Sequence, residues 1–258
     1  MDRQTLFGFQ LEGIVSYFVD NVAVIKLKSN AISSLSDIIS SRKLFSIFKQ
    51  AAESDEIKVM LIICEKEAIG EDDYSRFMKS IIREDIDENI GDRQKFIHRE
   101  TQLARYRSIN VLNRFLTLTL SFDKITVMAM QGSVSTPFFG LSLANDFRYA
   151  SEDMTYALTH KKFGLHPSGG IPFLLPRYIG VNKATEILLT KEYVPAQEAF
   201  NLGLINKVLP NENFEQHVLN EIKQFSKLDL NQIHMTCRLL HYFDNDIQKY
   251  LELEEKFI

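Results

Sequence analysis

Two histidines supply the residue type best suited to acid–base chemistry, and they lie close together in the stretch THKKFGLHPSGG. Histidine changes its charge near neutral pH, so one imidazole ring can both accept and return a proton. His160 is followed by Lys161 and Lys162, whose positive charges lower the pKa of a nearby imidazole. His166 precedes Pro167 in a glycine-rich loop, where a structural role is the simpler interpretation. A solitary histidine often only packs or is solvated, so both interpretations of His160 stay open at this point.

Two further segments contain residue types that can bind a ligand. The carboxylates of Glu71–Asp73 have the charge of a cation site, but no further ligand at a recognisable spacing supports one. A solvated loop is the better interpretation, and no metal site is expected. The segment Ser135-Thr136-Pro137 has the composition of a helix start, because threonine is a good N-cap and proline is favoured at the first helical position.

The elements that must position these residues alternate between strands and helices. Apolar, β-branched runs predict strands over residues 14–19 and 22–27, joined by a hairpin turn at Asp20-Asn21, and over 59–64, 125–130, 147–150 and 205–209. Helical spacing predicts helices over 38–52, 106–122, 171–178, 184–189, 196–202, 214–225 and 230–257. Residues 65–107 are rich in charge, and we expect helical fragments there with a mobile segment at 85–92. The alternation predicts an α/β fold with a mostly helical last third.

Composition limits the possible functions. The 258 residues, 45% of them hydrophobic and 25% charged, predict one large domain or a domain with a helical appendage. The 30 basic and 34 acidic side chains give a net charge of -4, which argues against nucleic-acid binding. No apolar run has the length of a membrane span or the form of a signal peptide, so we expect a soluble, cytoplasmic protein that binds no membrane.

Four segments resemble sequence patterns of the enoyl-CoA hydratase/isomerase family, the crotonase-like proteins. FDKITVMAMQG resembles the strand S-x-K-P-V-I-A-A-V-x-G, and ANDFRYA resembles the C-D-x-x-x-A that follows the first active-site helix. KKFGLHPSGGIPFLLPRYIG resembles V-K-L-G-L-x-P-G-x-G-G-T-Q-R-L-P-R-x-I-G, and KATEILLTKEYVPAQEAFNLGLINKVLP resembles the segment that follows it in the family. The match is best from Asp123 to Pro210 and looser in the N-terminal third.

The resemblance implies a crotonase-like α/β fold, a spiral of β-β-α turns with a C-terminal helical region. We expect a core domain over residues 1–195 and a helical oligomerisation region over residues 196–258. A homotrimer or hexamer is implied, as is a site for an acyl thioester of CoA or of an acyl-carrier protein. No separate cofactor is expected, because CoA or phosphopantetheine belongs to the substrate.

The resemblance also implies an oxyanion hole, in which two backbone N–H groups bind the thioester oxygen as negative charge develops on it. The first donor corresponds to Asp72, whose carboxylate must then point away from that oxygen. The second falls on Pro137, which has no N–H, so Phe138 is the expected substitute. The alternatives are that the register of the match shifts here, or that this donor is lost and the segment is only an efficient helix start.

The positions of the family's two catalytic glutamates differ here. They correspond to Gly140, which cannot transfer a proton, and to His160, which can. Tyr74 follows the family's aspartate position, where it either contacts an acyl group or packs in the core. We therefore expect a substrate pocket with Tyr74, Pro137 and Gly140, and a single-base isomerase, lyase or decarboxylase acting through His160. A non-catalytic binding or structural subunit that keeps the fold is the alternative.

Overall fold

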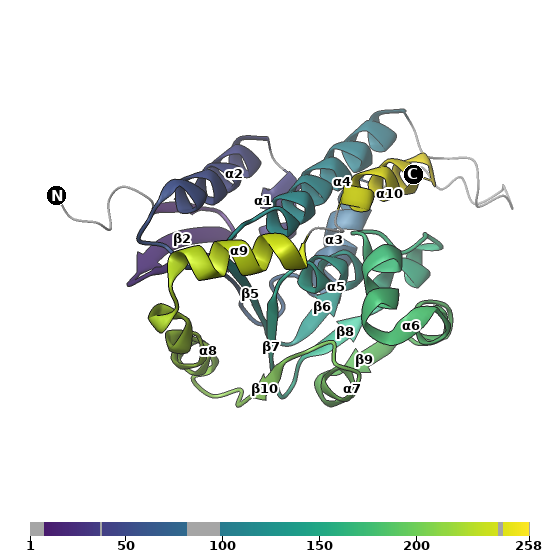
Figure 1. Ribbon diagram of the computed structural model, residues 1–258. Helices are drawn as coiled ribbons and strands as arrows, with labels where there is room; N and C mark the ends of the chain where they lie inside the picture. Colours follow the sequence, from purple (N-terminus) through teal and green to yellow (C-terminus); the bar gives the residue numbers. More distant parts are fainter. Residues whose placement is uncertain (1–7, 37, 82–98, 242–244, 258) are drawn as a thin grey trace, which may run out of the picture.

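The computed structural model describes residues 8–36, 38–81, 99–241 and 245–257, and a seven-stranded sheet forms its centre (Figure 1). The strand order is β1-β2-β3-β4-β5-β7-β10. Their bounds are Phe9–Leu11, Ile14–Val19, Val22–Leu27, Val59–Cys64, Ile125–Met130, Phe147–Ser151 and Lys207–Leu209. β1, β2 and β3 pair antiparallel, and every pair from β3 to β10 is parallel. The α/β class and the hairpin at Asp20-Asn21 are confirmed.

The central strands are continuous apolar runs because helices cover both of their faces. All six residues of β4 and all six of β5 are buried. Side chains alternate between the faces, so Met60 and Ile62 of β4 join one core cluster and Leu61 and Ile63 join the other. Strands of this kind lack the apolar–polar alternation of a half-exposed sheet.

Helices α1 to α5 pack on the first face, α6 packs against α5, and helices α8 and α9 lie on the second face (Figure 1). The α-helices are α1 Ala31–Ser36, α2 Ile38–Glu53, α3 Glu71–Ile81, α4 Arg99–Leu120, α5 Thr136–Leu143, α6 Ile171–Thr190, α7 Ala196–Asn201, α8 Phe214–Ile222, α9 Leu230–Leu240 and α10 Asn245–Glu254. The 3-10 helices are η2 Thr159–Phe163, η3 Lys223–Lys227 and η5 Glu255–Phe257. The predicted mobile segment, residues 85–92, lies outside the described residues, between α3 and α4 in the sequence.

A small second sheet, which the sequence did not predict, carries the start of α5. It has the order β6-β8-β9, with bounds Ser133–Ser135, Thr155–Ala157 and Tyr193–Pro195. β6 runs directly into α5. Strands of three residues are too short to give a periodic pattern. The two helices predicted within α6 are one element with a kink at Gly180, whose φ is 75°.

The end of α2 is fixed to the start of β5 by a buried lysine. The ammonium of Lys124 donates hydrogen bonds to the carbonyl oxygens of Ala51, at 2.7 Å, and Ser54, at 2.6 Å. The side chain is 1% exposed, and burial lowers the pKa of its amine. These bonds satisfy carbonyl groups that a helix leaves unpaired at its C-terminus.

Candidate active site

An apolar cavity lies between α1, α3, α4 and the start of α5, and it includes about 670 Å³ of space that no atom fills, open solvent included. The lining residues are Ile32, Leu35, Tyr74, Phe77, Met78, Ile109, Val111, Leu112, Phe115, Pro137, Phe138, Leu165, His166 and Ser168. The last three belong to the loop between η2 and α6. Of the six residues expected at the site, Tyr74, Pro137 and Phe138 line the cavity. The other three lie outside its lining.

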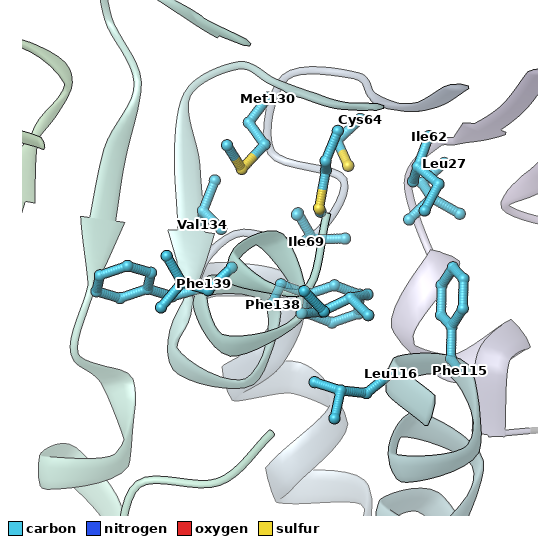
Figure 2. Packing of buried hydrophobic residues seen from close by; sticks show 14 of the residues in the cluster. Leu27, Ile62, Cys64, Ile69, Phe115, Leu116, Met130, Val134, Phe138 and Phe139 are labelled. Atoms are coloured by element: carbon cyan, nitrogen blue, oxygen red, sulfur yellow. The ribbon is translucent and has the colours of Figure 1, made fainter. Parts of the chain in front are cut away.

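The first turn of α5 forms one wall of this cavity. Phe138 is 3% exposed, and Figure 2 shows it on the side of α5 that faces Phe115 and Leu116 of α4. Its N–H lies in the first helical turn, where no carbonyl of the same helix can accept it. Pro137 precedes it and has no N–H. Phe138 therefore carries the backbone donor of α5 that is nearest to the cavity wall.

The N-cap of α5 is Ser135, so the prediction that Thr136 caps this helix is wrong by one residue. The hydroxyl of Ser135 donates to the carbonyl oxygen of Ile69 at 2.8 Å. The hydroxyl of Thr136 is instead 3.0 Å from Nδ1 of His160. The two side chains thus tie the start of α5 to neighbouring segments rather than to its own N–H groups.

The first turn of α3 holds the other expected oxyanion donor. The N–H of Glu71 donates to Oγ of Ser133 at 3.1 Å, so this amide is already used. The N–H of Asp72 follows in the first turn, and the Asp72 side chain is exposed. Asp72 itself does not line the cavity. Tyr74 does, and its ring packs edge-on against Phe163 at 5.9 Å between centroids.

The space beside Gly140 is filled by backbone. A Cβ atom built on Gly140 would lie 2.0 Å from the carbonyl oxygen of Gly169, and one built on Gly169 would lie 2.5 Å from the carbonyl oxygen of Pro137. The glycine-rich loop and α5 therefore meet through their backbones. A glutamate at position 140, as in hydratases, does not fit this packing.

A carboxylate from the end of α10 holds the same loop. Glu254, 3% exposed, accepts the N–H of Gly169 at Oε1, 2.9 Å away, and the N–H of Gly170 at Oε2, 3.3 Å away. Burial raises the pKa of Glu254, against the opposing effect of hydrogen bonds from Tyr250, Gly169 and Gly170. Sequence reasoning missed this residue, because 84 positions separate it from Gly170.

His160 is buried and hydrogen-bonded rather than open to the cavity. Nδ1 of its ring is hydrogen-bonded to the hydroxyl of Thr136, and the ring is also hydrogen-bonded to the backbone carbonyl of Leu188. A carbonyl oxygen can only accept, so the nitrogen facing Leu188 carries the proton and Nδ1 accepts from the Thr136 hydroxyl. Burial, with smaller contributions from Lys161 and His166, lowers the pKa of His160 to about 4. The ring is therefore neutral at physiological pH.

His166 is a cavity residue for which sequence reasoning favoured a loop role. It lines the cavity together with Leu165 and Ser168. Its Nδ1 lies 3.3 Å from the carbonyl oxygen of Pro167. Only the folding of the loop against α5 brings this ring to the cavity, and no local sequence pattern marks that approach.

Two kinds of site are absent from the described parts of the chain. No group of three or more His, Cys, Asp or Glu side chains there is placed to hold a metal ion. Within those same residues, no helix combines the length and the hydropathy needed to cross a bilayer.

The sequence profile described as enoyl-CoA hydratase/isomerase matches residues 90–257. The chain is 29% identical over 133 residues to enoyl-CoA delta isomerase 2 of Rattus norvegicus, covering 50% of this chain and 33% of that protein. It is 23% identical over 216 residues to the trans-2-decenoyl-[acyl-carrier-protein] isomerase of Streptococcus mutans, covering 82% of this chain and 76% of that protein. The chain thus spans a third of the rat relative's length.

Solved structures share the fold. The enoyl-CoA hydratase from Bacillus halodurans superposes with a TM-score of 0.76 at 19% identity, covering 95% of this chain and 93% of that one. The enoyl-CoA hydratase from Mycobacterium avium subsp. paratuberculosis gives a TM-score of 0.71 at 19% identity over 96% of this chain and 93% of that one. The crotonase-like fold expected from the resemblance is confirmed.

Proposed function

Because the chain belongs to the enoyl-CoA hydratase/isomerase family, we propose that its cavity binds the acyl part of a thioester and that it shifts a double bond with a single base. The observation that carries the proposal is the composition of the cavity. Its wall is apolar, one end reaches the start of α5, and the lining residues that the structure describes include no carboxylate. Water addition with two carboxylates has no counterpart in that lining.

The start of α5 supports binding of the thioester group. An N–H in the first turn of a helix lacks a helical acceptor and carries partial positive charge. The N–H of Phe138 is such a donor at the cavity wall, and we propose that the thioester oxygen binds there. The Asp72 N–H is the proposed second donor. Its exposed carboxylate avoids placing negative charge beside that oxygen.

The position of Gly140 supports isomerase-type over hydratase-type chemistry. The carbonyl oxygen of Gly169 occupies the place where a side chain at position 140 would begin. A double-bond shift needs one group that removes a proton and returns it, whereas hydration in this family uses two acidic side chains. Both the rat and the streptococcal relative are named isomerases.

The role of His160 as acid or base stays a prediction, and its surroundings support a different proposal. Its hydrogen bonds to Thr136 and Leu188 use both ring nitrogens. A ring with a pKa of about 4 is a weak base near neutral pH. We propose that His160 positions Thr136, and through it the first turn of α5.

A non-catalytic binding subunit is the second candidate function, favoured by the replacement of the usual donor by Pro137. Titration calorimetry with decanoyl-CoA and with decanoyl-pantetheine tests binding, and absorbance assays with 3-decenoyl and 2-decenoyl thioesters test turnover. Binding with conversion between the two enoyl thioesters supports the isomerase. Binding without conversion supports the non-catalytic subunit, and no binding of any thioester rejects both.

We also propose that the chain forms a homotrimer or a hexamer, as the family resemblance implies. Met235, Leu239 and Leu240 on α9 are 67%, 74% and 69% exposed, and contiguous apolar side chains of this kind favour association. Mass photometry of the purified protein tests this proposal. A monomer at micromolar concentration would contradict it.

A further inference from the structure

The glycine-rich loop that closes one side of the cavity ends in two residues with left-handed backbone. Leu165, His166 and Ser168 of this loop line the cavity. Gly169 and Gly170 follow them with φ values of 78° and 70°. Glycine adopts positive and negative φ about equally well and loses much conformational freedom when it is fixed. The two glycines alone therefore do not determine where the loop lies, and contacts from elsewhere must do so.

The contact that fixes the two glycines comes from the C-terminal helix. Glu254 accepts the N–H of Gly169 at Oε1, 2.9 Å away, and the N–H of Gly170 at Oε2, 3.3 Å away. Each N–H group thus has an oxygen of its own. Both groups also lie at the N-terminal end of α6, where negative charge is favoured. A carboxylate fits this place better than an amide, because the NH₂ group of an amide would face one of the two N–H groups.

The helix that carries this carboxylate is itself anchored in the core. Ile247 and Leu251 of α10 are 2% and 5% exposed, and Figure 1 shows α10 beside α4, which it contacts. The ring of Tyr250 packs on Phe173 of α6, with 5.3 Å between the centroids. The Tyr250 side chain is also hydrogen-bonded to Glu254. The carboxylate is therefore oriented by its own helix as well as by the loop.

The loop in turn contacts the first turn of α5 through its backbone. A Cβ atom built on Gly169 would lie 2.5 Å from the carbonyl oxygen of Pro137, so the two backbones meet without room for a side chain. Phe138, whose N–H is the proposed donor to the thioester oxygen, comes next in α5. A displacement of Gly169 therefore affects both the lining of the cavity and the first turn of α5.

We infer that Glu254 is a positioning residue of this cavity, an assignment that rests on the proposed function in thioester binding. From α10 it sets the place of the glycine-rich loop and, through that loop, the place of the first turn of α5. Glu254 does not line the cavity, so it acts only through these contacts. Its effect is to keep Leu165 and Ser168 at a fixed spacing from the Phe138 N–H.

The test uses Glu254→Gln, which keeps the size of the side chain and replaces one acceptor oxygen by a donor group. At a temperature where the variant is folded, we expect kcat with 3-decenoyl-CoA to fall by about 10–10²-fold, as for a misplacement of about 1 Å. The Kd for decanoyl-CoA should rise by about two- to tenfold, the range that one hydrogen bond contributes.

Two controls separate positioning from stability. Glu252→Gln, at an exposed position of the same helix, should change neither kcat nor Kd. Lys124→Met removes the buried hydrogen bonds between α2 and β5, so it should lower Tm and leave the kcat and Kd of the folded protein unchanged. A merely structural Glu254 would behave in the same way as Lys124.

The outcomes separate this assignment from the function on which it rests. If wild-type protein binds no thioester, the proposed function fails and the assignment fails with it. If it binds thioesters and converts none, the isomerase fails, and Kd decides the assignment: a rise in Glu254→Gln supports it and an unchanged value rejects it. If wild-type protein is active, a folded Glu254→Gln that keeps its kcat overturns the assignment alone.

A milder variant covers the case in which circular dichroism shows that Glu254→Gln does not fold. Tyr250→Phe keeps the ring on Phe173 and removes only the hydroxyl that bonds Glu254. A fall in kcat of about two- to tenfold, or the same rise in Kd where there is no turnover, supports the assignment. Unchanged values reject it.

Discussion

Substitution of Gly140 tests whether backbone packing closes the position of the missing glutamate. In Gly140→Ala the new Cβ would lie 2.0 Å from the carbonyl oxygen of Gly169, whereas ordinary contacts begin at 3.4 Å, so the loop must move by about 1.4 Å. Overpacking of this kind costs about 1–3 kcal/mol. The shift also strains the bond from Gly169 to Glu254, and hydrogen bonds to charged groups contribute about 1.5–3 kcal/mol. Against these costs, alanine is more favourable than glycine within a helix by about 0.5–1 kcal/mol.

The expected result is a net loss of about 2–4 kcal/mol in the free energy of unfolding, which corresponds to a fall in Tm of roughly 5–15 °C for a chain of this size. Urea unfolding and differential scanning fluorimetry measure the two quantities. Gly164→Ala is the contrasting control, because Gly164 has open space around it but a φ of +62°. It should lose only about 1–2 kcal/mol, from left-handed strain. A Gly140→Ala variant within about 0.5 kcal/mol of wild type would refute the steric argument.

Three further substitutions test the contacts around the site. Lys124→Met leaves two carbonyl oxygens without their donor and should destabilise the fold by about 2–3 kcal/mol in urea unfolding. Glu254→Ala leaves two buried N–H groups without an acceptor and should cost about 2–4 kcal/mol, whereas Glu252→Ala, at an exposed position of the same helix, should cost less than about 0.5 kcal/mol. In the folded protein the pKa of His160 is about 4, below its ordinary 6.5. Its neutral, buried ring therefore contributes fully to the free energy of unfolding above pH 6.5, and this contribution disappears as the pH falls toward 4. That difference is about 3 kcal/mol, and His160→Gln should flatten the dependence of unfolding free energy on pH over this range.

The central sheet was predictable because its strands are long apolar runs. Residues 59–64 and 125–130 pack on both faces, and such burial leaves a signal that needs no tertiary information. The hairpin at Asp20-Asn21 was predictable because Asp and Asn are residue types that tight turns favour, and Asp20 does take a positive φ, 50°. β6, β8 and β9 were missed, because three residues are too few to show a period.

The site was only partly predictable, because its parts meet through tertiary contacts. The resemblance to the family placed Tyr74 and Pro137 at a substrate pocket and Phe138 at an oxyanion hole, and all three line the cavity. His166 reaches the cavity only after the loop folds against α5. Glu254 reaches the same loop from the end of the chain. No local sequence pattern indicates that either side chain comes close to these parts of the site.

The replaced positions form one connected arrangement rather than separate losses. Gly140 admits the carbonyl oxygen of Gly169, and Glu254 holds that glycine from the other side. His160 meanwhile is bonded to Thr136 at the start of the same helix. Restoring glutamate at position 140 alone would therefore displace the loop before it could supply a carboxyl group to a substrate.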